Sequence, residues 1–163
     1  MTGTASFDDL GTYRYRLTRI WDGDRPEVIW VMLNPSTADA TSDDPTIRRV
    51  VGFSRSWGFG SAVVVNLFAL MATSPADLVT HPTPVGPGND EEILAATSAA
   101  EVVVAWGNHG TVPNPDTGVS RAHEVRDLVA NGRSRLMCLG TTGAGQPRHP
   151  LYLRSVTTPV PFP

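Results

Sequence analysis

Apolar and polar positions divide the chain into short apolar runs and longer segments with helical spacing. Four apolar runs have the length and composition of buried strands, and they span residues 28–33, 62–68, 101–106 and 135–139. Residues 13–21 instead alternate apolar and polar side chains, which is typical of a half-exposed edge strand. Between the apolar runs, apolar residues recur on one helical face at residues 44–57, 91–100 and 119–131.

Capping residues predict where these helices begin and end. Asp43-Asp44-Pro45 is expected to start the first helix, which Gly58 then stops. Asn89 or Asp90 is expected to cap the second helix, and Asn131-Gly132 to end the third.

The order of these elements predicts the fold class. Strands that alternate with helices imply right-handed crossovers and a parallel sheet covered on both faces. We therefore expect a three-layer α/β sandwich with a central four-stranded, mainly parallel sheet. The alternating residues 13–21 offer one further edge strand at the N-terminal end of the chain. With no internal repeat or domain boundary in the sequence, we expect a single α/β domain over residues 1–163. Residues 1–11 are expected to be flexible, 71–89 to form a long ordered loop, and 156–163 to form an extended proline-rich tail.

Composition narrows the class of protein. The chain has 163 residues, of which 40% are hydrophobic, as in an ordinary globular protein. No apolar run approaches the ~20 residues that span a membrane, and the N-terminus lacks the regions of a signal peptide, so we expect a cytoplasmic protein without a membrane partner. Cys138 is the single cysteine, which excludes an intrachain disulfide and predicts a buried thiol. The histidines and Cys138 lack the spacing of a zinc site, so neither a metal nor a cofactor is expected.

The charged residues restrict the chemistry and the partners. All 13 basic residues are arginine, which excludes lysine Schiff bases and the lysine-dependent P-loop. The formal net charge of −3 argues against a broad cationic surface for duplex DNA. A local arginine cluster can still hold one or two phosphates, so we expect a small nucleotide or nucleobase ligand, or a short or single-stranded nucleic-acid contact. The oligomeric state is left open.

Polar residues follow each of the four apolar runs. The carboxyl ends of parallel strands meet at one edge of a sheet, where ligands bind, so these segments are expected to share one pocket. The segments are Asn34-Pro35-Ser36, Asn66-Leu67-Phe68, Trp106-Gly107-Asn108-His109 and Arg148-His149-Pro150-Leu151-Tyr152.

Several of these side chains have a chemistry that suits a nucleotide. Asn66 interrupts an apolar strand, so its amide either bonds neighbouring backbone or reads the edge of a nucleobase. His149 lies between two prolines and can donate to a developing oxyanion, while Arg148 can hold a phosphate. Of the aspartates after the first buried strand, one can cap the helix, and another can orient or deprotonate a water. These aspartates are Asp39, Asp43 and Asp44.

The chain resembles a known family over nearly its whole length, from about residue 12 to 155. Its motifs closely resemble those of the domain of unknown function 1643 family. They include Leu33-Asn-Pro-Ser-Thr-Ala-Asp39, Asp43-Asp-Pro-Thr-Ile-Arg48, Val65-Asn-Leu-Phe-Ala-Leu70, Ala105-Trp-Gly107 and Pro147-Arg-His-Pro-Leu-Tyr152. That family carries no established activity.

A more distant resemblance connects the same motifs to the uracil-DNA glycosylase superfamily. Leu33-Asn34-Pro35 is similar to its first motif, where an Asn or Asp before Pro positions the attacking water. Val65-Asn66-Leu67 resembles its base-reading strand, Val103–Gly107 its third strand, and His149-Pro150 the motif whose His stabilises the departing base. The resemblance implies a four-stranded parallel sheet and glycosylase-like chemistry. Ser36 and Leu151-Tyr152 differ from the residues usual in those motifs.

The leading hypothesis is a glycosylase-like hydrolase that acts on a nucleobase in a nucleotide, nucleoside or DNA. Asn34, with Asp43 or Asp44, would orient water, and His149 would stabilise the leaving base. The remaining candidates for substrate binding are Pro35, Ser36, Asn66, Phe68, Trp106, Asn108, His109, Arg48, Arg148 and Tyr152. One alternative is a non-catalytic nucleotide or modified-base binding module on the same scaffold. Another is a structural or interaction protein, in which the four strand ends would not share a pocket.

Overall fold

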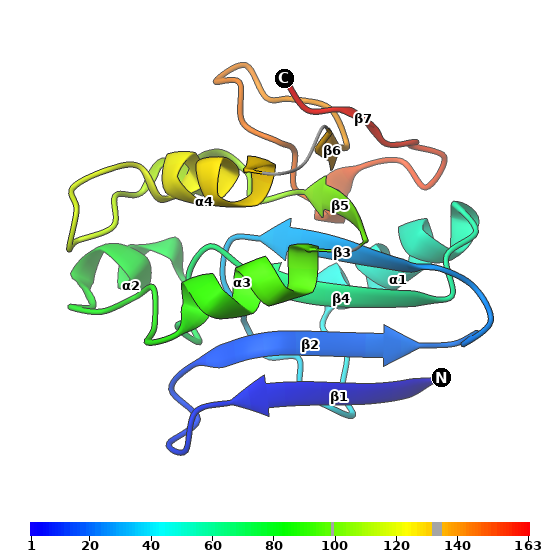
Figure 1. The fold of residues 1–163 in the computed structure, drawn as a ribbon, viewed down its shortest axis with the longest axis horizontal. Helices are drawn as coiled ribbons and strands as arrows, with labels where there is room; N and C mark the ends of the chain where they lie inside the picture. Colours follow the sequence, from blue (N-terminus) through cyan, green and yellow to red (C-terminus); the bar gives the residue numbers. More distant parts are fainter. Residues whose placement is uncertain (99, 132–134) are drawn as a thin grey trace.

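The protein is a mixed α/β protein with a seven-stranded sheet. The structure is a computed structural model that describes residues 1–98, 100–131 and 135–163. The strands lie in the order β1-β2-β4-β3-β5-β6-β7, and helices cover both faces of the sheet (Figure 1). The sheet therefore has more strands than the four to five that the sequence predicted.

The apolar runs of the sequence form neighbouring strands that pair in parallel. β3 (Glu27–Met32) lies between β4 (Ser61–Asn66) and β5 (Glu101–Val104), and β5 also pairs with the short β6 (Met137–Cys138). Every residue of β4 is buried, as expected for a strand covered on both faces. The carboxyl ends of these strands lie at the same edge of the sheet.

The N-terminal residues were predicted incorrectly. Residues 1–11 were expected to be flexible, but β1 (Thr2–Phe7) pairs antiparallel with β2 (Arg14–Ile20). β2 in turn pairs antiparallel with β4, so β1, not β2, is the edge strand. The side chains of β1 are mostly small and polar and form no apolar pattern, so a search for such patterns does not detect this strand. The strand is held in the sheet by its pairing with β2.

The C-terminal tail forms the opposite edge of the sheet. β7 (Val160–Pro161) pairs antiparallel with β6, so the extended tail contributes a strand. The two termini consequently lie at opposite edges of the sheet (Figure 1).

α1 (Pro45–Ser56) covers one face of the sheet. Asp44 caps this helix by accepting a hydrogen bond from the Ile47 amide at 2.8 Å, so the predicted helix start is confirmed. The predicted apolar face of α1 packs against the sheet, where Trp30 donates to the Ser54 hydroxyl at 3.0 Å and stacks on Trp57.

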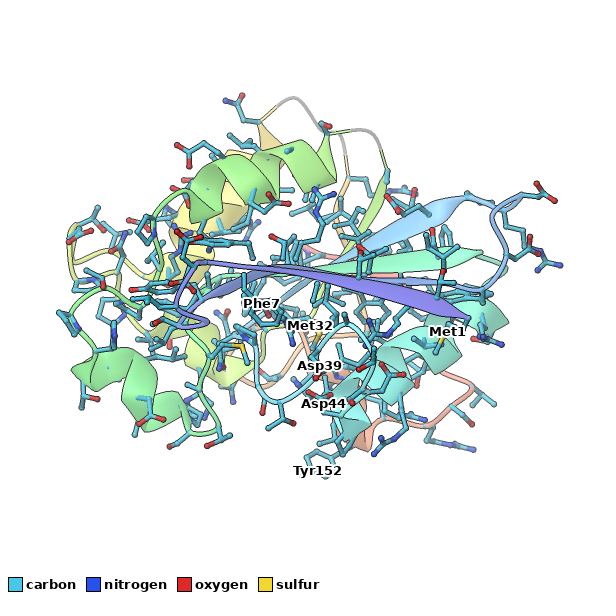
Figure 2. The ribbon with its side chains drawn as sticks, turned by 90° about the horizontal axis from the view of Figure 1, so that it is seen from below. Met1, Phe7, Met32, Asp39, Asp44 and Tyr152 are labelled. Carbon is cyan, nitrogen blue, oxygen red and sulfur yellow. The ribbon has the colours of Figure 1, made fainter. Side chains whose placement is uncertain are left out.

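α3 (Asn89–Thr97) and α4 (Arg121–Ala130) cover the other face. Figure 2 shows the sheet from its β1 edge, with α3 and α1 on opposite sides of it. The residue that caps α3 is Gly88, not Asn89 or Asp90 as predicted. Asn89 instead donates to the backbone carbonyls of Asn66 and Leu67, at 3.0 and 3.2 Å.

The predicted loop differs from the structure, whereas the predicted end of α4 agrees with it. The predicted loop 71–89 contains a short helix, α2 (Pro75–Thr80), which Ser74 caps. α4 ends at Ala130 with Asn131 as its C-cap, as predicted, and Gly132 of the predicted stop lies outside the described residues. Among the helices that the structure describes, none has the length and apolar character needed to cross a membrane.

Candidate functional site

A small pocket lies at the carboxyl ends of β3 and β4, on the face of the sheet that α1 covers. Its volume is about 160 Å³. Met32, Val64 and Ile47 form part of its apolar wall. Figure 2 shows Met32 and Asp44 on this side of the sheet. The polar residues in its lining that could bind or act on a ligand are Arg14, Asn34, Ser36, Asp44, Asn66 and His149.

The backbone holds the side chain of Asn34 in one orientation. Its Nδ2 donates to the carbonyl oxygens of Pro35 at 3.0 Å and Ala72 at 2.8 Å. The Ala72 amide donates back to the same Pro35 carbonyl at 3.0 Å, which ties the loops after β3 and β4 together. Because both amide hydrogens are used in this way, Oδ1 is the atom of Asn34 that is suited to accept a hydrogen bond from a ligand or a water.

Asn66 is the last residue of β4, and its side chain is almost completely buried. Within the described part of the chain its Nδ2 has no hydrogen-bond acceptor. A buried donor without a partner costs about 1–3 kcal/mol, so such groups are rare in folded proteins. The sequence left two alternatives for this amide, a bond to neighbouring backbone or a contact with a nucleobase. The structure shows no donation from Nδ2 to the backbone of the described residues.

His149 presents a defined tautomer to the pocket. Its Nδ1 accepts a hydrogen bond from the Leu151 amide at 3.2 Å, so in the neutral ring the proton lies on Nε2. Burial lowers the pKa of His149 from its usual value of 6.5, and the charge of Asp44 opposes this shift only in part. A neutral imidazole that donates from Nε2 follows from both observations.

The three candidate aspartates have different positions. Asp44 lines the pocket, and one of its carboxylate oxygens caps α1. Asp43 pairs with Arg19 at 2.7 Å, and neither Asp43 nor Asp39 is part of the pocket lining. The Asp39 carboxylate accepts hydrogen bonds from the amides of Thr41 and Ser42, which lower its pKa. Asp44 is therefore the aspartate that can act on a ligand in this pocket.

Arg14 is a pocket residue that the sequence analysis missed. It is the first residue of β2, and only 2% of its surface is exposed. Its NH1 donates to the Ala38 carbonyl at 2.5 Å, while its Nε has no acceptor among the described residues. Burial lowers the pKa of Arg14 to about 10, with Asp44 acting in the opposite direction. An arginine in an alternating strand gives no signal of this burial, because the loop after β3, whose Ala38 carbonyl accepts its hydrogen bond, is distant from Arg14 in the sequence.

Two aromatic candidates lie away from the pocket, contrary to the expectation of one shared site. Phe68 and Trp106 belong to the apolar core beneath α3 and α4. Trp106 Nε1 donates to the Gln146 side chain at 2.9 Å, and its ring meets Phe162 edge-to-face. β4 ends at Asn66 and β5 ends at Val104, so strand alternation no longer fixes the direction of the side chains that follow.

The loop candidates are also not part of the pocket lining. Pro35 is buried but lies outside the lining. Tyr152 is 91% exposed and projects away from the body of the protein (Figure 2). The other residues expected in the site lie at exposed positions, and they are Arg48, Asn108, His109 and Arg148.

The loop after β5 is not part of the pocket lining, and it supports the segment that carries His149. The Gly107 amide donates to the Pro147 carbonyl at 2.9 Å. Gly107 has φ +71 and ψ −171, a conformation that is accessible almost only to glycine. This contact fixes the start of the segment that carries His149.

No group of three or more residues with metal-binding side chains occurs among the residues that the structure describes. The fold and the site together define an α/β protein with a small polar pocket at the carboxyl ends of its parallel strands. The chain belongs to the family described as "Protein of unknown function (DUF1643)", whose model matches residues 14–151. Neither the curated proteins nor the solved structures contain a significant match to the chain.

Proposed function

We propose that the protein is a glycosylase-like hydrolase that cleaves the bond between a nucleobase and its sugar. The observation that carries this proposal is the buried Nδ2 of Asn66, which has no acceptor in the described chain and lines the same pocket as Asn34 and His149. An amide that reads a base edge, an oxygen that orients water and a donor for the leaving base are the groups that such a reaction requires.

In the proposed reaction, Oδ1 of Asn34 accepts a hydrogen bond from the attacking water. The water oxygen forms a bond to the anomeric carbon, and the carbon–nitrogen bond breaks with its electron pair on the base. The Nε2 hydrogen of His149 stabilises the negative charge on an oxygen of that base. The carboxylate of Asp44 accepts the proton that the water loses, because the amide of Asn34 is too weak a base.

The order of the elements supports a relationship to the uracil-DNA glycosylase superfamily, which remains part of the proposal. Asn34-Pro35 follows β3, Asn66 ends β4, and His149-Pro150 follows β6. We propose that the four strands that pair in parallel correspond to the central sheet of that superfamily. Fold likeness alone does not establish an activity, so the reaction has to be measured.

The test is release of free base from a panel of modified nucleotides, nucleosides, and single- and double-stranded DNA. We expect Asn34→Ala and His149→Ala each to lower the rate by about 100-fold or more, as for the loss of a positioned catalytic group. His123→Ala is a matched control, because His123 is exposed on α4 and is not part of the pocket lining. Thermal melting of each variant separates loss of activity from loss of folding.

A non-catalytic binding module is the second candidate. The observation that favours it is the cap of α1, which already uses one oxygen of Asp44, the residue proposed to accept the proton. Ligands that raise the melting temperature but release no base would support this module and contradict the hydrolase.

A further inference from the structure

Among the residues that the structure describes, three arginines are almost completely buried. Arg14, Arg19 and Arg121 are 2%, 4% and 1% exposed. A guanidinium carries a permanent positive charge, and its burial is costly unless a carboxylate and hydrogen-bond acceptors compensate it. The partners of each buried arginine therefore indicate what it does.

Arg19 and Arg121 have the partners expected of structural arginines. Arg19 pairs with Asp43 at 2.7 Å and also donates to backbone carbonyls. Arg121 pairs with Asp90 at 2.5 Å and Glu124 at 3.1 Å, and its Nε donates to a backbone carbonyl at 2.8 Å. Both charges are compensated within the folded chain.

Arg14 differs from both. In the described part of the protein no carboxylate lies within ion-pair distance of its guanidinium, and its Nε has no acceptor. Asp44 and Asp39 act on it only through space. Arg14 also lines the pocket, together with the unpartnered Nδ2 of Asn66. The pocket thus contains two buried groups that can only donate, one of them charged.

We propose that Arg14 is a ligand-binding residue whose guanidinium donates hydrogen bonds to an anionic oxygen of the molecule that binds in this pocket. The inference rests on the proposed function in one respect, which is that this pocket is the ligand site. A guanidinium binds an anionic oxygen through charge-assisted hydrogen bonds, which are about twice as strong as neutral ones. The anionic oxygen can belong to the phosphate of a nucleotide or to the base when it leaves as an anion.

Calorimetric titration at neutral pH with two pairs of probes tests this inference. Uridine 5′-monophosphate against uridine tests the phosphate, and 5-nitrouracil, which is an anion at neutral pH, against uracil tests the base. We expect the anionic member of one pair to bind about 10- to 100-fold more tightly to the wild-type protein. The pair that shows the preference identifies the source of the anionic oxygen.

Arg14→Met should abolish this preference, and Arg14→Lys should retain part of it. Arg25→Met is the control, because Arg25 is exposed and pairs with Asp22 outside the pocket. The inference is overturned if neither pair shows a preference in the wild type, or if the preference survives in Arg14→Met. Should that variant not fold, an undiminished preference in Arg14→Lys would also overturn it.

A urea unfolding series separates ligand binding from a structural role. Removal of Arg14 takes away an uncompensated charge at the cost of one hydrogen bond to the Ala38 carbonyl, so we expect the unfolding midpoint to fall less in Arg14→Met than in Arg121→Met. Arg121→Met should lower the midpoint, because it removes the ion pairs of Arg121 with Asp90 and Glu124 and its hydrogen bond to the Leu67 carbonyl. An equal loss in both variants would make Arg14 structural and contradict the inference.

The same variants distinguish this inference from the proposed hydrolase. Arg14-dependent binding of an anionic probe without any base release would refute the hydrolase and leave the inference standing. Base release at an unchanged rate in Arg14→Met would refute the inference and leave the hydrolase standing.

Discussion

Single residues of the pocket hold polar groups that the folded chain itself does not satisfy. Asn66 Nδ2 and Arg14 Nε are two of the three buried side-chain atoms without a hydrogen-bond partner among the described residues. The third, Oδ1 of Asn89, belongs to a side chain that donates to the carbonyl of Asn66. Each such group costs stability, and proteins retain these costs at functional sites. Arg14 and Asn66 line the same pocket, which Asn89 does not, and this pair is a stronger indication of ligand binding than the strand-end motifs alone.

His149 predicts a pH dependence of stability at the residue scale. Burial lowers its pKa below the value of about 6.5 that it has in the unfolded chain. As the pH falls below about 6.5 the unfolded chain binds a proton before the folded one does. The stabilising contribution is therefore complete above that pH and is lost as the pH falls through the lower, folded-state pKa.

We expect the wild-type melting temperature to fall more steeply than that of His149→Gln between about pH 7.5 and pH 5. Differential scanning calorimetry at several pH values measures this difference. His123→Gln is the control, because that histidine is exposed on α4. Equal slopes for the wild type and His149→Gln would contradict the lowered pKa.

Among the elements, the loops after the strands carry the site, and they support one another. The Ala72 carbonyl accepts a hydrogen bond from Asn34 and so fixes its side chain. The Gly107 amide donates to the Pro147 carbonyl and so fixes the segment that carries His149. The loop after β5 thus acts on the pocket indirectly. Its glycine is the residue that the backbone conformation requires.

Gly107→Ala should cost about 2 kcal/mol of unfolding free energy, because alanine cannot adopt that conformation without strain. A Cβ at this position would lie 3.8 Å from the Cβ of His149, which is an ordinary van der Waals contact, so the expected loss comes from the backbone conformation and not from a clash. Urea denaturation measures the stability, and base release or ligand titration measures the site. Gly143→Ala is the matched control in the loop after β6, where a Cβ meets no atom within 4 Å. A loss of equal size in both variants would contradict this role for Gly107.

The elements also show which predictions sequence patterns support. α1 was predicted from Asp44, Pro45 and its apolar face, since these signals are local to the helix. β1 and α2 were missed because neither has an apolar pattern of its own, and α2 is also short for a helix. β1 is stabilised by pairing with a strand that follows it in sequence, which a local pattern cannot reveal.

For the whole molecule, charge limits the partners. The formal net charge is −3, so the surface as a whole does not attract polyanions.

The family match covers residues 14–151, which include every residue named here as lining the pocket. The matched range therefore contains the pocket, while β1 and β7 lie outside it.

We expect random-sequence duplex DNA to bind with a Kd no tighter than about 100 µM at physiological salt, because few counterions would be released. Fluorescence anisotropy of a labelled duplex at two salt concentrations measures this. Tight binding with a steep salt dependence would contradict the expectation and identify an extended cationic surface. A labelled single strand of the same length serves as the comparison.

The sequence by itself determined the class of fold and the edge of the sheet where the site lies. Apolar runs bury themselves, and the carboxyl ends of parallel strands meet, so Asn34, Asn66 and His149 were predicted to converge from local patterns. Only the tertiary structure decided that Arg14 joins them while Phe68 and Trp106 turn to the opposite face. The physical reason is that burial and partners depend on which segments cover a side chain, and for Arg14 those segments are distant in sequence.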